Sequence, residues 1–177
     1  PLSPAINGDT IQYKYVKGVI DRSKRTCEIT ISAPDSAQPQ SADEYVKAGD
    51  TSWALRAFRE FDDVLLRLRL NEPEIGTVII RTIGDPEAVI AVDQVLYDNA
   101  SHWLVREIIG LIRRTLKRMD LTSRSFFALI EPGNAFAGTL FELALAADRS
   151  YMLDDPERPN AVQLSPLNGG GYPMSNG

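Results

Sequence analysis

The stretch Phe127–Met152, FALIEPGNAFAGTLFELALAADRSYM, constrains the fold of this chain more than any other. An apolar run over residues 126–130 ends close to a Pro-Gly pair, a pattern typical of a buried parallel strand. A turn of small residues follows, and a helix rich in Leu and Ala is expected over residues 140–147. Residues 151–153 are the expected next strand. The stretch therefore predicts a strand, a turn, a helix and a second strand in succession.

The start of this helix is a candidate site for an anion. The first N–H groups of a helix have no acceptor inside it, and the nearest ordinary N-cap residue, Asn134, lies several residues too early. The amides of Gly138 and Thr139 are therefore candidates to hold a developing oxyanion. Glu142 lies one turn further on and could move a proton, because burial raises the pKa of a carboxyl group. The alternative is that Glu142 is an acidic residue in the first helical turn that only interacts well with the helix dipole.

The rest of the chain alternates between strand and helix patterns. Residues 88–97 are apolar without a clear period, so strand and helix both stay open there. The other expected elements are a flexible segment over residues 1–10, strands over 11–20 and 26–32, an exposed loop over 33–49, a helix from the cap residues 50–52 to before Pro73, a buried strand over 76–82, and a long helix after Ser101. This order predicts an α/β fold, with helices covering a largely parallel sheet in one domain over residues 11–177.

Composition excludes several classes of site and partner. A single Cys excludes an internal disulfide and a Cys-based zinc site, and a single His disfavours a His-rich metal site and a Ser-His-Asp triad. A net charge of −5 argues against nucleic acid as a partner. No apolar run approaches the roughly 20 residues that a membrane span needs, and no signal peptide is visible. We expect a cytoplasmic protein, and the start without Met suggests an excerpt of a longer chain.

The string AFAGTLFELALAAD, residues 135–148, resembles the signature of the crotonase (enoyl-CoA hydratase/isomerase) superfamily. That signature has a small, Gly-rich turn, then Glu-Leu-Ala, then a small residue and Asp. The resemblance implies a crotonase-like spiral of β-β-α units, here partial and without the C-terminal helices of the family. It places Thr139 and the adjacent Gly138 at the second oxyanion donor, Ile90 at the first, and Glu142 at the catalytic acid. It also implies an acyl-CoA substrate, in which CoA is part of the substrate, and no metal or redox cofactor.

Three segments narrow the resemblance further. Residues 106–118, 125–152 and 167–177 are similar to the second crotonase-like half of the benzoyl-CoA-dihydrodiol lyase family. The resemblance implies a domain of an enzyme that cleaves the ring of an oxidised benzoyl-CoA in aerobic benzoate degradation. It further implies packing against an N-terminal crotonase-like half and allows homo-oligomerisation.

Two departures from the superfamily pattern leave alternatives open. Leu140 is bulky where Gly is usual, and the second catalytic carboxylate should fall near Leu167 or Asn168, neither of which is acidic. One hypothesis is that the domain acts on an oxidised aromatic acyl-CoA thioester through an oxyanion hole and Glu142. The other is that it is a catalytically degenerate structural or dimerisation domain of the same enzyme, and a generic enoyl-CoA hydratase/isomerase is a further alternative. The departures favour the degenerate domain here and thioester chemistry for the parent enzyme.

Overall fold

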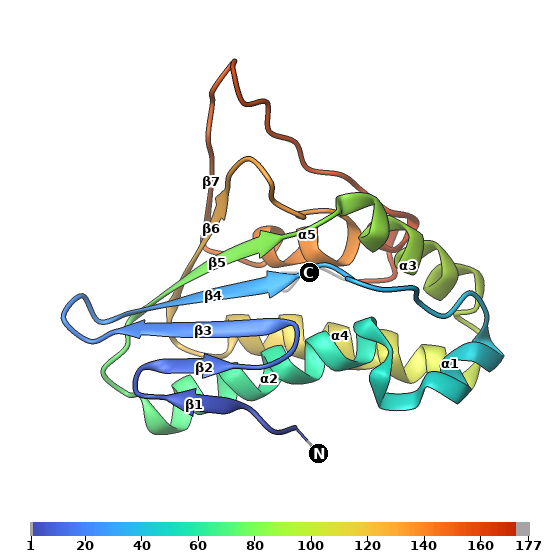
Figure 1. The fold of residues 1–177 in the computed structure, drawn as a ribbon, viewed down its shortest axis with the longest axis horizontal. Helices are drawn as coiled ribbons and strands as arrows, with labels where there is room; N and C mark the ends of the chain where they lie inside the picture. Colours follow the sequence, from blue (N-terminus) through green and yellow to red (C-terminus); the bar gives the residue numbers. More distant parts are fainter. Residues whose placement is uncertain (1, 173–177) are drawn as a thin grey trace.

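A seven-stranded sheet organises the computed structural model, which describes residues 2–172, and its strands lie side by side in sequence order (Figure 1). The strands are β1 (Ala5–Asn7), β2 (Thr10–Gln12), β3 (Val16–Asp21), β4 (Thr26–Ser32), β5 (Thr77–Ile83), β6 (Ser125–Ile130) and β7 (Arg149–Met152). The helices are α1 (Ala42–Ala48), α2 (Trp53–Asn71), α3 (Pro86–Asp98), α4 (Trp103–Asp120) and α5 (Gly138–Leu145), with 3-10 turns η1 (Gly49–Thr51) and η2 (Pro166–Gly169).

The strand pairing changes from antiparallel to parallel at β4. Strands β1 to β4 form an antiparallel meander, whereas β4 to β7 pair in parallel. Each parallel pair needs a crossover, and the helices supply it: α1 and α2 between β4 and β5, α3 and α4 between β5 and β6, and α5 between β6 and β7. The α/β prediction is therefore confirmed, although only half of the strand pairs are parallel, because four short strands precede the first crossover.

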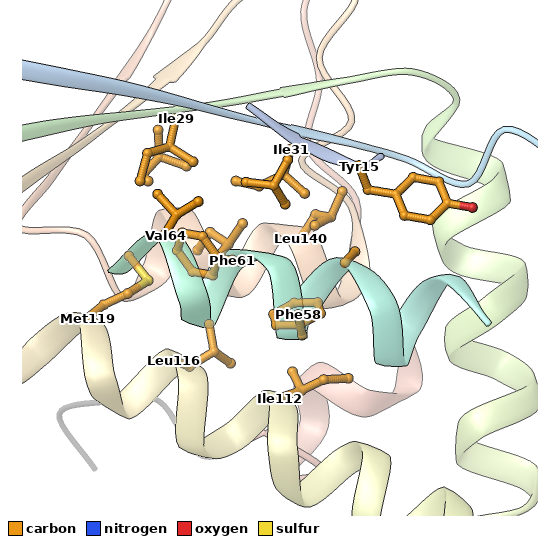
Figure 2. Close-up of a cluster of buried hydrophobic side chains, with 14 of the residues drawn as sticks. Tyr15, Ile29, Ile31, Phe58, Phe61, Val64, Ile112, Leu116, Met119 and Leu140 are labelled. Atoms are coloured by element: carbon orange, nitrogen blue, oxygen red, sulfur yellow. The ribbon is translucent and has the colours of Figure 1, made fainter. Parts of the chain in front are cut away.

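The core lies between the sheet and two helices. Cys27, Ile29 and Ile31 of β4 are buried and alternate with half-buried residues, as expected for a strand that presents one face to the core. Figure 2 shows α2 between this sheet face and α4. The side chains that meet there are Ile29 and Ile31 from β4, Phe58, Phe61 and Val64 from α2, Ile112, Leu116 and Met119 from α4, and Leu140 from α5. Both helices are amphipathic, so their apolar stripes face each other and the sheet.

Helix α5 is positioned by the core on one side and by α3 and η2 on the other. It contacts β5, β6 and β7, and it also contacts α3 and η2, which come from distant parts of the chain. Leu140 is fully buried and lies beside Ile31, Phe58 and Phe61. The bulky residue at position 140 therefore serves the core.

The N-terminal half contains three departures from the predicted elements. Ala5–Asn7 forms β1 within the segment expected to be flexible, because the turn at Gly8, with φ of +55°, lets it pair with β2. Residues 11–20 form two strands, β2 and β3, where one was expected. The expected loop over 33–49 contains α1, whose cap Ser41 accepts a hydrogen bond from Glu44 N–H at 3.3 Å.

The uncertain segment 88–97 belongs to a helix. Asp85 accepts a hydrogen bond from Glu87 N–H at 2.9 Å, and Pro86 occupies the first helical position, so α3 begins before the apolar run. The part of the resemblance over residues 173–177 lies outside the described residues. Over residues 2–172, no helix is both long and apolar enough to cross a membrane.

Candidate functional site

The site predicted from the sequence lies at the start of α5. The N-cap residue of this helix, Ala137, has no side chain that could accept a hydrogen bond, so the first N–H groups need acceptors from elsewhere. Gly138 N–H donates to the carbonyl oxygen of Gln163 at 2.9 Å. Thr139 N–H donates to Asp93 Oδ2 at 2.7 Å. Both amides that were expected to receive an oxyanion are therefore paired within the chain.

These pairs bear on the expected role of Gly138 and Thr139 as oxyanion donors. The prediction that both amides lack acceptors follows from the absence of a nearby cap, since Asn134 lies too early. The acceptors come instead from distant segments of the chain. Ile90, the third predicted donor, is the fifth residue of α3, where its N–H faces the carbonyl group four residues earlier. In this conformation all three amides face acceptors within the chain, and their role as oxyanion donors stays a prediction.

A buried carboxylate, Asp93, lies at the centre of the site. Asp93 is 0% exposed, and its Oδ2 accepts hydrogen bonds from Thr139 N–H at 2.7 Å and from Ser165 Oγ at 2.6 Å. Its Oδ1 accepts a hydrogen bond from the Thr139 hydroxyl. Because that hydroxyl has only one proton, the hydroxyl of Tyr172, 3.0 Å away, donates to Thr139 Oγ1. A carboxylate of α3 thus has three protein donors.

Burial dominates the electrostatics of this cluster. Desolvation raises the pKa of Asp93 from its ordinary value of 3.8 to about 6, against the hydrogen bonds from Ser165 and Thr139, which lower it. The negative charge of Glu142 adds to the rise. Desolvation also raises the pKa of Tyr172 well above its ordinary value, so its hydroxyl stays a donor. Among the ion pairs of the described residues, none involves Asp93.

Glu142 lies in the same buried region but is held by a different residue. It is 2% exposed, and its Oε1 accepts a hydrogen bond from Asn168 Nδ2 at 2.7 Å. The same amide nitrogen lies 3.1 Å from the carbonyl oxygen of Gly138, which brings Glu142 next to the start of α5. Desolvation raises the pKa of Glu142, and the Asn168 hydrogen bond lowers it. Since α5 begins at Gly138, Glu142 belongs to its second turn, and the first-turn dipole interpretation does not apply.

Asn168 explains one departure from the superfamily pattern. The resemblance places a second catalytic carboxylate near Leu167 or Asn168. Leu167 is a buried core residue, and Asn168 uses its amide to hold Glu142 and its Oδ1 to accept from Ser165 N–H at 2.7 Å. The position therefore supplies a hydrogen-bond donor to the acid where a second acid was expected.

Six side chains form the buried hydrogen-bonded cluster at the start of α5, and the sequence alone indicated a functional role for two of them. Thr139 and Glu142 were singled out, whereas the parts played by Asp93, Ser165, Asn168 and Tyr172 were not. One signal was present, because Asp93 is the only charged residue on the α3 face formed by Val89, Val92 and Leu96, all of which are buried. That signal depends on assigning residues 88–97 to a helix. Across residues 2–172, no group of three or more His, Cys, Asp and Glu side chains is placed to hold a metal ion.

Comparison with known proteins shows what this chain is similar to. No protein-family model matches the chain. Over 176 residues, the chain is 48% identical to a benzoyl-CoA-dihydrodiol lyase from Aromatoleum evansii, and the match covers 99% of this chain and 32% of that protein. The chain therefore spans about a third of the length of this curated relative.

Solved structures show the same fold at low sequence identity. An enoyl-CoA hydratase from Geobacillus kaustophilus has a TM-score of 0.57 and 17% identity, covering 95% of this chain and 55% of that chain. DspI from Pseudomonas aeruginosa also has a TM-score of 0.57, with 14% identity, covering 97% of this chain and 60% of that chain. The predicted partial crotonase fold is confirmed, since the chain covers just over half of each structure. The chain is therefore a crotonase-fold relative of benzoyl-CoA-dihydrodiol lyase.

Proposed function

We propose that the protein containing this chain is a lyase that acts on an oxidised aromatic acyl-CoA thioester of the benzoyl-CoA class. We further propose that this domain is a structural part of that enzyme and does not itself activate the thioester. The proposal for the whole protein is supported by the 48% identity to the curated lyase over nearly the entire chain. The proposal for the domain is supported by the hydrogen bonds that the Gly138 and Thr139 amides already make within the chain.

Thioester chemistry of this class places two demands on a site. Two N–H groups must stabilise the thioester oxygen as it becomes an enolate, and a carboxylate must move a proton. Here the Gly138 amide is paired with Gln163 and the Thr139 amide with Asp93. The observation that carries the structural role is this pairing, because a substrate would have to displace two hydrogen bonds, one of them to a buried carboxylate. The resemblance adds that the parent reaction needs no metal or redox cofactor.

A second candidate function is acid–base catalysis by Glu142 within this domain. It is favoured by one observation, namely that desolvation raises the pKa of a carboxyl group next to the start of α5. For Glu142 to reach a thioester, the segment from Gln163 to Asn168 would have to move, since it occupies both the Gly138 amide and the carboxyl group of Glu142.

Replacing Glu142 by Gln in the full-length protein separates the two candidates. Gln keeps an oxygen that can accept from Asn168 Nδ2, so the fold should be preserved. Unchanged turnover of an oxidised benzoyl-CoA substrate supports the structural role, and a loss of several orders of magnitude supports catalysis by Glu142. Glu157→Gln is the matched control, because Glu157 is an exposed residue outside the cluster. Absence of binding to a CoA thioester at millimolar concentration would contradict the lyase proposal itself.

We also propose that the remainder of the parent protein is the main partner of this domain. The curated relative is about three times as long as this chain, which leaves room for a further crotonase-like half. Homo-oligomerisation of the parent protein is part of the same proposal. Light scattering of the full-length protein measures its mass in solution, and a mass of one chain would contradict homo-oligomerisation.

A further inference from the structure

We propose that β7 carries the surface on which the remainder of the parent chain docks, and that the docking segment is an apolar strand that pairs with the free edge of β7. The β7 surface consists of Tyr151, Met152 and Leu153, together with Phe127 and Leu129 of β6. The inference rests on the proposal that this chain is part of a longer protein. It is independent of the reaction that the longer protein catalyses.

Among the described residues, β7 pairs with one strand only. It is the last strand of the sheet and runs parallel to β6, from Arg149 beside Phe127 to Met152 beside Ile130. Figure 1 shows it at the end of the sheet opposite β1. All four of its residues are exposed. The N–H and C=O groups along such a free edge can take up another strand by main-chain hydrogen bonds.

The exposed side chains at this edge are largely apolar. Tyr151, Met152 and Leu153 follow one another and are 50%, 48% and 39% exposed. Because side chains alternate along a strand, Tyr151 and Met152 point to opposite faces of the sheet, so both faces of β7 present apolar atoms to solvent. Edge strands that stay free are commonly protected by Pro or by charged residues, and Arg149 is the only charged residue of β7. These features favour a strand that becomes buried when its partner docks.

The β7 surface continues onto the neighbouring strand. Phe127 and Leu129 lie beside Arg149 and Tyr151 in the pairing register and are half-buried, whereas the alternate residues of β6 are buried in the core. The rings of Phe127 and Tyr151 make an edge-to-face contact, with centroids 6.0 Å apart. Parallel sheets normally have both faces covered. The face that carries these rings therefore lacks the cover that the core gives to the other face.

Space for the side chains of a docking strand lies next to the edge. Met152 and Leu153 line a hollow of about 450 Å³, and the segment 154–160 forms its remaining wall. Pro156 and Pro159 add apolar atoms to that wall. Leu153 N–H donates to the carbonyl oxygen of Ile130 at 3.0 Å, so the chain is held to β6 where the hollow begins. A strand beside β7 can therefore place apolar side chains into this hollow.

The remainder of the parent chain is favoured as the occupant over a second copy of this chain. About two thirds of the curated relative lies outside the match, so ample further chain is available in a protein of that length. From β4 to β7, each parallel strand lies beside the one that precedes it in sequence, and a further strand of the same protein fits the free edge by the same crossover. Linkage in one chain also gives this strand a high effective concentration.

Hydroxyl-radical footprinting of the full-length protein tests the proposal without any substitution. Mass spectrometry of peptides locates the oxidised side chains, and each rate in the native protein is divided by the rate in urea. Tyr97 on α3 is the matched control, because it is 52% exposed and Tyr151 is 50% exposed. We expect the normalised rate of Tyr151 to be several-fold lower than that of Tyr97, with Met152 and Leu153 protected in the same way. Equal normalised rates for the two tyrosines would overturn the proposal.

Cross-linking identifies the occupant. A photoreactive phenylalanine analogue replaces Tyr151 in full-length protein, and isotope-labelled and unlabelled chains are refolded together before irradiation. Cross-linked peptide pairs of a single isotope, joining position 151 to a segment outside residues 1–177, support docking of the same chain. Pairs that mix the isotopes would show that a second copy covers β7 and would overturn the proposal.

Failure of docking and failure of the proposed lyase function give different results. An active enzyme in which Tyr151 oxidises as fast as Tyr97 would overturn the docking surface alone. A protein in which Tyr151 is protected, but which does not turn over an oxidised benzoyl-CoA, would support the docking surface and contradict the lyase proposal.

Discussion

The strongest quantitative prediction concerns the pH dependence of stability that Asp93 imposes. Asp93→Asn keeps the size of the side chain and an oxygen that can accept from Thr139 N–H, but it removes the titration. The pKa of Asp93 rises from 3.8 to about 6 on folding. Each pKa unit corresponds to 1.36 kcal/mol, so the group changes the free energy of unfolding by about 3 kcal/mol over this range.

The sign follows from the direction of the shift. Because the pKa is raised in the folded chain, the folded chain binds the Asp93 proton more tightly than the unfolded chain does. The stabilisation from this proton is complete below about pH 4 and is lost as the pH rises through about 6. Relative to Asp93→Asn, the wild type should therefore become less stable by about 2.4 kcal/mol between pH 4 and pH 7, the larger part of the full change.

Urea unfolding of both chains at pH 4, 5, 6 and 7 measures this difference. Subtracting the two curves removes the contributions of all other titrating groups that behave alike in both proteins. Glu142 is the one neighbouring acid whose pKa is also raised, so the same pair is compared in a Glu142→Gln background. If the wild type and Asp93→Asn differ by the same free energy of unfolding at every pH, in both backgrounds, then folding does not raise the pKa of Asp93 and the prediction is wrong.

Three further predictions follow from the site and the core. Gly138→Ala should lower the free energy of unfolding by about 1–3 kcal/mol, since its Cβ would overlap Asp93 Oδ2. In a double-mutant cycle, the same substitution should cost less in the Asp93→Ala background, where that oxygen is gone. An equal cost in both backgrounds would mean that the strain does not come from Asp93. Leu140→Ala should cost about 2–5 kcal/mol in urea unfolding because Leu140 is fully buried, and a change below about 1 kcal/mol would contradict its role in the core. Turnover of the full-length protein should survive dialysis against a chelator, and a loss restored by a divalent cation would contradict the reaction without a metal cofactor.

Much of the fold could be predicted because its signals are local. The period of two at Cys27, Ile29 and Ile31 and the helical spacing of Phe58, Phe61 and Leu65 both survive in the structure, since side chains on one face share one environment. Helix α3 was left open because its apolar residues do not repeat cleanly, although Asp85 and Pro86 gave a start signal.

The site was only partly predictable for a different reason. The free amides of Gly138 and Thr139 were inferred from the residues next to them, and nothing in that stretch reveals that Asp93 and Gln163 approach from elsewhere. Hydrogen-bond partners that are distant in sequence are fixed by the packing of α3 against α5, which no local pattern encodes. Glu142 is buried and burial raises its pKa, as its candidate role requires, and neither observation needed those distant partners; its catalytic role stays a prediction.

The sequential order of the strands has a consequence for how the protein is made. Each new strand docks onto the one synthesised just before it, so the sheet can grow from β1 towards β7 while the ribosome is still at work. Asp93, by contrast, meets its donors only when α5 and Ser165 have emerged. Burying this charge therefore requires segments of the chain that are more than 40 residues apart to be in place together.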